Sequence, residues 1–145
     1  MTSLTTSWVL DANLDVWAFL PGPGRDRAAA LLAQADRIVV PSLWVYEVTS
    51  VLHAIFRLRP TPEEIFTAAL DDLLRLPDEV VSPDVALARA AYAWADRLGQ
   101  RKAYDAFYLA LAERLGAEFW TGDQRLYRRA RQVGANFVRL LRAED

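Results

Sequence analysis

Two short stretches, Trp8-Val9-Leu10-Asp11 and Phe119-Trp120-Thr121-Gly122-Asp123, decide the fold class of this chain. Each begins with an apolar run that is too short for a buried helix, which predicts a buried strand. Each run is followed by an acid at the point where the strand is expected to end. Ligands of open α/β sheets bind at the carboxyl ends of the strands, so the two acids mark the expected functional edge.

Further short apolar runs alternate with longer amphipathic segments along the chain. We predict strands at 8–10, 37–40, 79–81, 118–120 and 136–138, and helices at 42–58, 62–76, 84–98, 105–115 and 124–133, with a shorter helix near 26–35. This alternation predicts an α/β fold, in which helices cover both faces of a central parallel sheet of about five strands. The segment Pro21-Gly22-Pro23-Gly24 is expected to form a surface loop.

Length and composition predict one globular unit. The chain has 145 residues, of which 53% are hydrophobic and 25% charged, and we expect a single domain over 8–145 after a flexible tail at 1–7. No apolar run reaches the roughly 20 residues that span a bilayer, which favours a cytoplasmic protein with no membrane partner. The net charge of −2 argues against a protein that coats nucleic acid, although a local basic patch remains possible.

The chain has few types of side chain that could act as nucleophiles, acid–base groups or metal ligands. There is no cysteine and only one histidine, His53, which excludes thiolate sites and multi-histidine zinc sites and leaves acid–base chemistry to carboxylates. We expect His53 to be packed in the core or at an interface, without a catalytic role. Trp17 and Trp44 are candidates for an interface.

Two more acids lie where an apolar side chain is expected. Glu47 is inside its predicted helix, on the stripe that faces the core, and Asp105 opens the predicted helix at 105–115 with apolar neighbours one turn on. A buried carboxylate is costly unless a cation partners it, and no Lys or Arg stands close to Glu47 or Asp11 in the sequence. Magnesium and manganese prefer oxygen ligands, so these acids indicate a hard divalent metal site.

A simpler explanation stays open for three of these acids. Aspartate is a favoured N-cap residue, and Asp11, Asp105 and Asp123 each stand near a predicted helix start. Glu47 has no capping role, because it lies inside its helix, and its alternative is a buried ion pair or an outward-tilted side chain.

The ordered set of motifs resembles a known family. The segments are Val9-Leu10-Asp11-Ala12-Asn13, Pro41-Ser42-Leu43 leading to Glu47-Val48, Tyr104-Asp105-Ala106-Phe107-Tyr108-Leu109-Ala110, and Thr121-Gly122-Asp123-Gln124-Arg125-Leu126. Together they resemble the PIN-domain ribonucleases of the VapC type, and the resemblance spans residues 8–138. It implies a three-layer α/β/α sandwich that cuts RNA with bound Mg²⁺ or Mn²⁺, commonly as a homodimer that an antitoxin protein neutralises.

The resemblance also assigns roles to individual residues. Asp11, Glu47, Asp105 and Asp123 match the family's acidic quartet of metal-binding and catalytic residues, and Thr121 matches a hydroxyl residue that helps to order the last acid. Asn13 departs from the pattern, because Ser or Thr often stands there. Its amide still hydrogen-bonds water or phosphate, so we keep it as a supporting residue.

Basic residues near the acids are candidate RNA contacts. Arg101 and Lys102 precede Asp105, and Arg125 and Arg128 lie on the last predicted helix. Their guanidinium and ammonium groups suit phosphate oxygens. The alternative is a solvated helix face without ligand.

Two other functions fit parts of the sequence. Asp11-Ala12-Asn13-Leu14-Asp15 weakly echoes the motif of a haloacid-dehalogenase-like phosphatase, but Asn13 stands where that motif needs its second Asp. A catalytically inactive PIN-like binding or scaffold module is the other alternative, and retention of all four acids argues against it.

Overall fold

A single parallel sheet forms the centre of the protein. The computed structural model describes residues 6–59 and 61–142, and within these residues five strands lie in the order β3-β2-β1-β4-β5. The strands are β1 (Ser7–Leu10), β2 (Arg37–Pro41), β3 (Glu79–Val81), β4 (Glu118–Thr121) and β5 (Val138–Leu140). All neighbouring pairs are parallel. The predicted α/β fold with a five-stranded parallel sheet is therefore confirmed.

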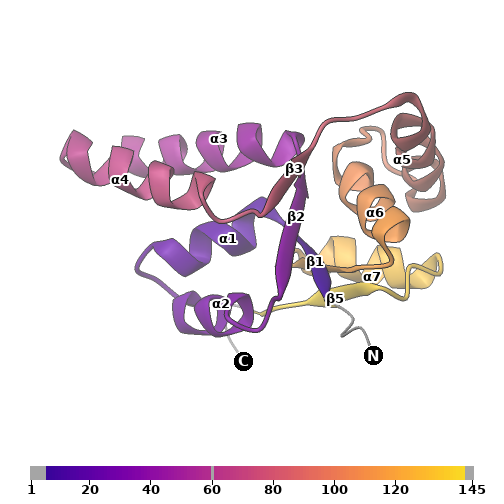
Figure 1. Ribbon diagram of the computed structural model, residues 1–145, viewed down its shortest axis with the longest axis horizontal. Helices are drawn as coiled ribbons and strands as arrows, with labels where there is room; N and C mark the ends of the chain where they lie inside the picture. Colours follow the sequence, from indigo (N-terminus) through magenta and orange to yellow (C-terminus); the bar gives the residue numbers. More distant parts are fainter. Residues whose placement is uncertain (1–5, 60, 143–145) are drawn as a thin grey trace.

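Helices cover both faces of the sheet, which gives three layers (Figure 1). On one side lie α1 (Ala12–Phe19), α2 (Arg25–Leu32), α3 (Leu43–Arg57) and α4 (Glu63–Leu74), and on the other α5 (Val85–Leu98), α6 (Tyr104–Leu115) and α7 (Gln124–Gln132). Such parallel sheets are buried on both faces. Accordingly, Val9, Leu10 and Phe119 are completely buried, and the ring of Tyr108 stacks on that of Phe119 with centroids 5.3 Å apart.

The ends of the helices follow from local chemistry. Asp84 caps α5, because its side chain accepts a hydrogen bond of 2.7 Å from the backbone amide of Leu87. Gly99 and Gly116 end α5 and α6 in the left-handed conformation, with φ of 70° and 62°. The first turn of α6, which carries Asp105, has Ala103 at its N-cap position and therefore no side-chain cap.

The structure corrects two of the predicted elements. Residues 12–19, for which only a helix start at Asp11 was predicted and no helix range, form α1, since Asp11 caps a segment whose apolar residues join the core. The last strand lies at Val138–Leu140 rather than 136–138, because residues 136 and 137 form a turn in which the amide of Val138 donates to the carbonyl of Ala135 at 3.3 Å. The loop at 21–24 is as predicted.

Two further expectations concern the chain ends and membranes. Of the tail expected at 1–7, residues 1–5 lie outside the described residues, and Ser7 already belongs to β1. In the part of the chain that the structure describes, no helix has both the length and the apolar character that crossing a membrane requires.

Candidate active site

Asp11 and Asp123 lie side by side because their strands are neighbours. β1 pairs with β4 in parallel, with Leu10 opposite Trp120, so both acids leave the same edge of the sheet one to three residues later. The backbone amide of Asp11 donates to the carbonyl of Trp120 at 2.9 Å and so extends this pairing. Each acid also caps a helix: Asp11 accepts from the amide of Asn13 at 3.4 Å, and Asp123 from that of Leu126 at 3.0 Å. Asp11 and Asp123 therefore each cap a helix and also face the shared edge of the sheet.

Thr121 links these two acids. Its side chain is fully buried at the end of β4, where its hydroxyl donates to Oδ2 of Asp11 at 2.7 Å. The same hydroxyl oxygen accepts a hydrogen bond of 3.0 Å from the backbone amide of Asp123. One hydroxyl therefore orients Asp11 and holds the turn that carries Asp123.

Glu47 and Asp105 approach from the two helical layers. Glu47, in α3, is half-buried and accepts a hydrogen bond of 2.6 Å from the phenol of Tyr108 in α6. Asp105, also half-buried, accepts one of 3.3 Å from the side-chain amide of Gln100. Both carboxylates are thus aimed by neutral donors, which orient them without neutralising their charge.

The four acids form one negatively charged cluster. Burial raises the pKa of Asp11, and the charges of Asp105 and Asp123 raise it further, while the Thr121 hydrogen bond opposes the rise. Burial also raises the pKa of Glu47, with further increases from Asp11 and Asp105. Burial and then the charge of Asp123 raise the pKa of Asp105. The four carboxylates therefore lie within electrostatic range of one another.

The chemistry of this cluster suits a hard divalent cation. None of the ion pairs found within residues 6–59 and 61–142 involves any of the four acids, so their charges are unbalanced by protein. In the same residues, no group of three or more Asp, Glu or His side chains is already arranged to hold a metal ion. A Mg²⁺ ion commonly takes one or two carboxylates and keeps several waters, so an open, oxygen-only cluster fits it.

The comparisons with known proteins agree with this geometry. The PIN domain family matches residues 8–132, a range that includes all four acids. The chain belongs to the PIN domain family. No curated protein sequence matches it. Membership in this family excludes the haloacid-dehalogenase-like alternative, which is a different family.

Solved structures share the fold of this PIN domain at low sequence identity. FitAcB from Neisseria gonorrhoeae is 16% identical with a TM-score of 0.66, covering 86% of this chain and 93% of that chain. VapBC2 from Rickettsia felis, bound to a promoter DNA fragment, is 13% identical with a TM-score of 0.64, covering 93% and 98%. VapC20 from Mycobacterium tuberculosis, a toxin that cleaves the sarcin-ricin loop, is 16% identical with a TM-score of 0.58, covering 79% and 86%.

One buried acid beside the cluster was missed from the sequence. Asp15, one turn after Asp11 in α1, is completely buried and accepts a hydrogen bond from the indole of Trp44. Burial raises its pKa well above the usual range, and its Oδ1 has no hydrogen-bond partner among the described residues. Trp44 is itself fully buried, so its expected place at an interface is wrong. The available signal was an acid between Leu14 and Val16, in an otherwise apolar turn.

Two other residues take different places from those expected. His53 is exposed on α3 rather than packed in the core. Tyr108 supports Glu47, whereas the sequence suggested only an apolar neighbour of Asp105. Burial and the nearby carboxylates raise the pKa of the Tyr108 phenol far above its usual value, so this phenol remains a hydrogen-bond donor.

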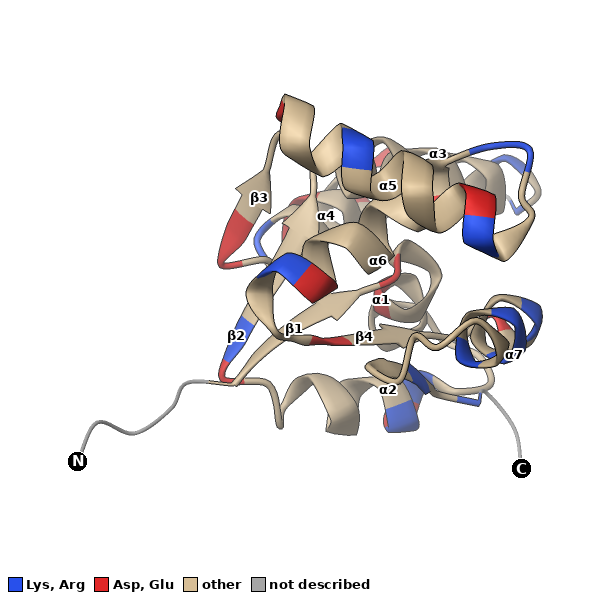
Figure 2. Cartoon of the chain, turned by 90° about the vertical axis from the view of Figure 1, so that its right-hand side faces the viewer, with Lys and Arg blue, Asp and Glu red and all other residues tan. Residues whose placement is uncertain are grey.

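The structure divides the arginines of α7 into two groups. Lys and Arg are concentrated on this helix (Figure 2). Arg129 donates to the carbonyl of Leu98 at 2.9 Å, and Arg131 to that of Asn136 at 2.6 Å, so both stabilise the fold. Arg125 and Arg128 are exposed, as are Arg101 and Lys102 in the loop after α5. The contact of Arg129 with the end of α5 places that loop beside α7.

Replacing Thr121 tests its dual role. In Thr121→Val, we expect nuclease activity to fall about 10- to 100-fold, the usual effect of losing a group that orients a metal ligand. Valine matches threonine in shape but cannot hold Asp11 or the Asp123 amide. Thr121→Ser is the control, because it keeps the hydroxyl and should retain most of the activity. The measurement is kcat/KM for nucleic-acid cleavage, and equal losses in both variants would contradict the role.

The raised carboxylate pKa values predict how stability depends on pH in the presence of chelator. Asp11, Asp15, Glu47 and Asp105 bind protons more tightly in the folded than in the unfolded chain. Stability should therefore rise as pH falls from about 7.5 towards about 5, above the usual carboxyl pKa of about 4. Asp84 acts oppositely, because Arg114 lowers its pKa to about 2, but its contribution is lost only below about pH 4.

Thermal unfolding followed by circular dichroism measures this effect. We expect the Tm in EDTA to be higher at pH 5 than at pH 7.5, and added Mg²⁺ to raise the Tm at pH 7.5 by occupying the cluster. A Tm that is lower at pH 5 than at pH 7.5 would contradict the raised pKa values of these carboxyl groups.

Proposed function

We propose that this PIN domain is a metal-dependent endoribonuclease and the toxin of a toxin–antitoxin pair. The observation that carries the proposal is the cluster of Asp11, Glu47, Asp105 and Asp123, aimed by neutral donors and without an ion-pair partner among the described residues. The family as a whole consists mainly of nucleases, and two similar structures carry names of the VapC and VapBC type.

Each residue of the cluster has a proposed task. Asp11, Glu47, Asp105 and Asp123 would hold one or two Mg²⁺ or Mn²⁺ ions, which supply Lewis-acid activation of a water and neutralise charge on the phosphate. Thr121 keeps Asp11 in the orientation that ligation requires. Asn13, exposed next to Asp11, offers its amide to phosphate or water. Without metal, the cluster repels the RNA backbone, so substrate binding is also metal-dependent.

Cleavage of RNA in the presence and absence of metal is the decisive experiment. We expect cleavage with Mg²⁺ or Mn²⁺, products with a 5′-phosphate, loss of activity in EDTA and recovery with excess metal. An inactive scaffold would bind metal in a titration without cutting RNA. Cleavage that persists in EDTA would refute the metal-dependent mechanism.

Arg101, Lys102, Arg125 and Arg128 are the proposed phosphate contacts. In Arg125→Ala/Arg128→Ala, we expect RNA binding to weaken and log Kd to depend less steeply on log salt, by about 0.7 per lost contact and about 1.4 in all. Arg75→Ala is the control, because Arg75 pairs with Asp72 before β3, at the opposite edge of the sheet. Equal salt slopes in wild type and double variant would remove these two arginines from the interface.

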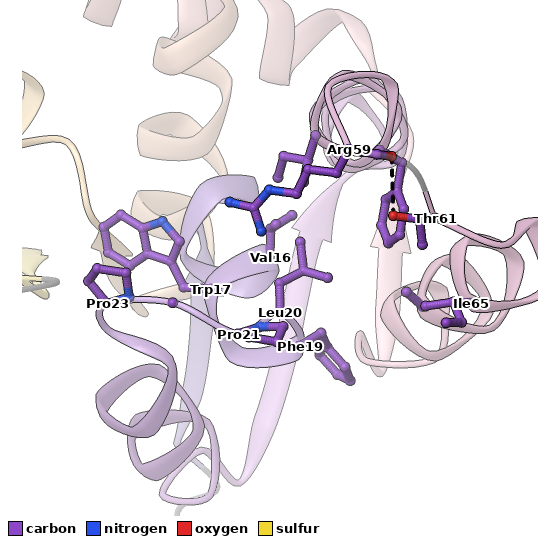
Figure 3. Close-up of a pocket in the computed structure, with 13 residues that line it drawn as sticks. Val16, Trp17, Phe19, Leu20, Pro21, Pro23, Arg59, Thr61 and Ile65 are labelled. Carbon is purple, nitrogen blue, oxygen red and sulfur yellow. Dashed lines mark hydrogen bonds between the residues drawn. The ribbon is translucent and has the colours of Figure 1, made fainter.

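An apolar groove is the proposed docking site for the antitoxin. It measures about 600 Å³ and lies between α1 with its following loop, the end of α3 and the start of α4. Figure 3 shows Phe19, Leu20 and Ile65 in its wall, with Arg59 extending over the side chains of α1. A partner segment with apolar side chains and one carboxylate suits this lining. Two of the similar structures are described as a toxin–antitoxin complex and as a member of a family of toxin–antitoxin systems.

A substitution in the groove separates neutralisation from catalysis. Ile65 is half exposed, so Ile65→Asp should fold normally and retain RNA cleavage while its inhibition by a co-expressed antitoxin is lost. Full neutralisation of this variant would place the antitoxin elsewhere. The homodimer expected from the resemblance stays a prediction.

A further inference from the structure

A second, smaller hollow lies at the starts of α3 and α6, the helices that carry Glu47 and Asp105. It measures about 240 Å³, and its lining includes the aromatic rings of Tyr46, Tyr104 and Phe107 as well as Pro41 and Pro83. None of its lining residues is charged. It differs in this respect from the acidic cluster and from the apolar groove, which contains Arg59.

The hollow lies at the same edge of the sheet as the acids. Pro41 and Val81 are the last residues of β2 and β3, whereas Asp11 and Asp123 follow β1 and β4. Neighbouring strands are about 4.8 Å apart, and β2 and β3 lie about one to three strand spacings from β1 and β4 along this edge. Adjacent nucleotides of an extended strand span such a separation.

The same two helix starts build both features. In α3, Tyr46 lines the hollow and the next residue, Glu47, joins the acidic cluster. In α6, Tyr104 lines the hollow and the next residue, Asp105, joins the cluster. Any ligand held between these tyrosines is therefore placed in a defined relation to the carboxylates.

The lining selects a flat, uncharged ring. Tyr46 and Tyr104 are 71% and 59% exposed, which is unusual for rings that only stabilise a core. A phosphate would find no cation in the hollow. The volume is below the roughly 300 Å³ at which sites for drug-sized molecules begin, so it suits one ring system rather than a whole nucleotide or a peptide segment.

We propose that this hollow receives an unpaired nucleobase of the RNA, next to the phosphate that is cut. The inference rests on the proposed ribonuclease function and adds to it a requirement on the substrate. Bases stack on exposed aromatic side chains when they have left their own helix, so the RNA must be single-stranded or locally unpaired at this position. Tyr46 and Tyr104 then act in binding and positioning rather than in the chemical step.

The test compares RNAs that each lack one base. Short unpaired RNAs, each with an abasic site at a different position, are titrated by fluorescence anisotropy with Ca²⁺ in place of Mg²⁺, so that binding is measured apart from cleavage. For the wild type, one position should weaken binding about tenfold or more when its base is absent. In Tyr46→Ser/Tyr104→Ser, the intact RNA should bind about tenfold more weakly, and this position should no longer matter. Tyr92→Ser is the matched control, because Tyr92 is 76% exposed on α5 and does not line the hollow.

The possible failures are distinguishable. If the wild type binds RNA but never cleaves it with Mg²⁺ or Mn²⁺, the ribonuclease function fails, whatever the tyrosines do. If it cleaves RNA and the double variant shows the same abasic penalties as the wild type, the base site is overturned. Sedimentation velocity tests one more outcome, namely that the hollow binds a second copy of the chain. In that case the wild type is a dimer, the double substitution dissociates it, and the RNA affinity per chain is unchanged.

Discussion

Asp11→Asn should abolish most of the nuclease activity without unfolding the protein. We expect the cleavage rate to fall about 10³-fold, the scale of losing one electrostatic stabiliser of the transition state. Asparagine is as good an N-cap as aspartate, so α1 should keep its start. Because Asp105 and Asp123 no longer face a third charge, the variant's Tm in EDTA should equal or exceed that of the wild type.

A matched substitution separates the charge from the cap. Asp84 also caps a helix through its side chain, but its carboxylate pairs with Arg114 and belongs to no cluster. Asp84→Asn should therefore cleave RNA at nearly the wild-type rate. Rates are measured under single-turnover conditions at saturating Mg²⁺. Similar rates for both asparagine variants would exclude Asp11 from the active site.

Gly122→Ala should reduce activity about 100-fold although it adds only one methyl group. A Cβ at Gly122 would lie 2.3 Å from the nearest carbon of the Trp17 ring, too close for either group to stay in place. Gly122 lies between Thr121 and Asp123, so a shift of this turn moves both the Thr121 hydroxyl and the Asp123 carboxylate. A displacement of about 1 Å at a reacting group costs about 10²-fold in rate. The comparison is kcat for RNA cleavage in variant and wild type.

A second substitution tests whether the clash is the cause. Trp17→Leu removes the ring that the new methyl group meets, so Gly122→Ala/Trp17→Leu should recover activity towards that of Trp17→Leu alone. Gly116→Ala controls for the loss of a glycine, because no side chain crowds that position. It should destabilise the fold through its positive φ while leaving the rate per folded molecule unchanged. A double variant as inactive as Gly122→Ala would point to backbone strain instead.

Local patterns in the sequence were sufficient for most of the fold. The apolar runs ending at Leu10 and Val40 predicted strands because each is short, is rich in residues with strong β-propensity and lies between turn signals. Gly99 and Gly116 marked two helix ends because only a residue without a side chain adopts a positive φ easily. The pattern was insufficient for α1, whose eight residues are too few for a clear period, and for β5, where a turn at residues 136–137 delays the start of the strand.

For the candidate site, too, the sequence predicted some features and only the tertiary structure revealed others. Adjacent parallel strands bring their carboxyl ends together, so the sequence was enough to predict that Asp11 and Asp123 lie at one edge, and an acid on an apolar stripe was enough to single out Glu47. Tertiary packing alone decided that the Thr121 hydroxyl serves both strand-end acids and that Tyr108 aims Glu47. It alone decided that Asp15 is buried against Trp44. These contacts join residues 29 to 110 positions apart or depend on which way a side chain turns, and neither property is encoded in local periodicity.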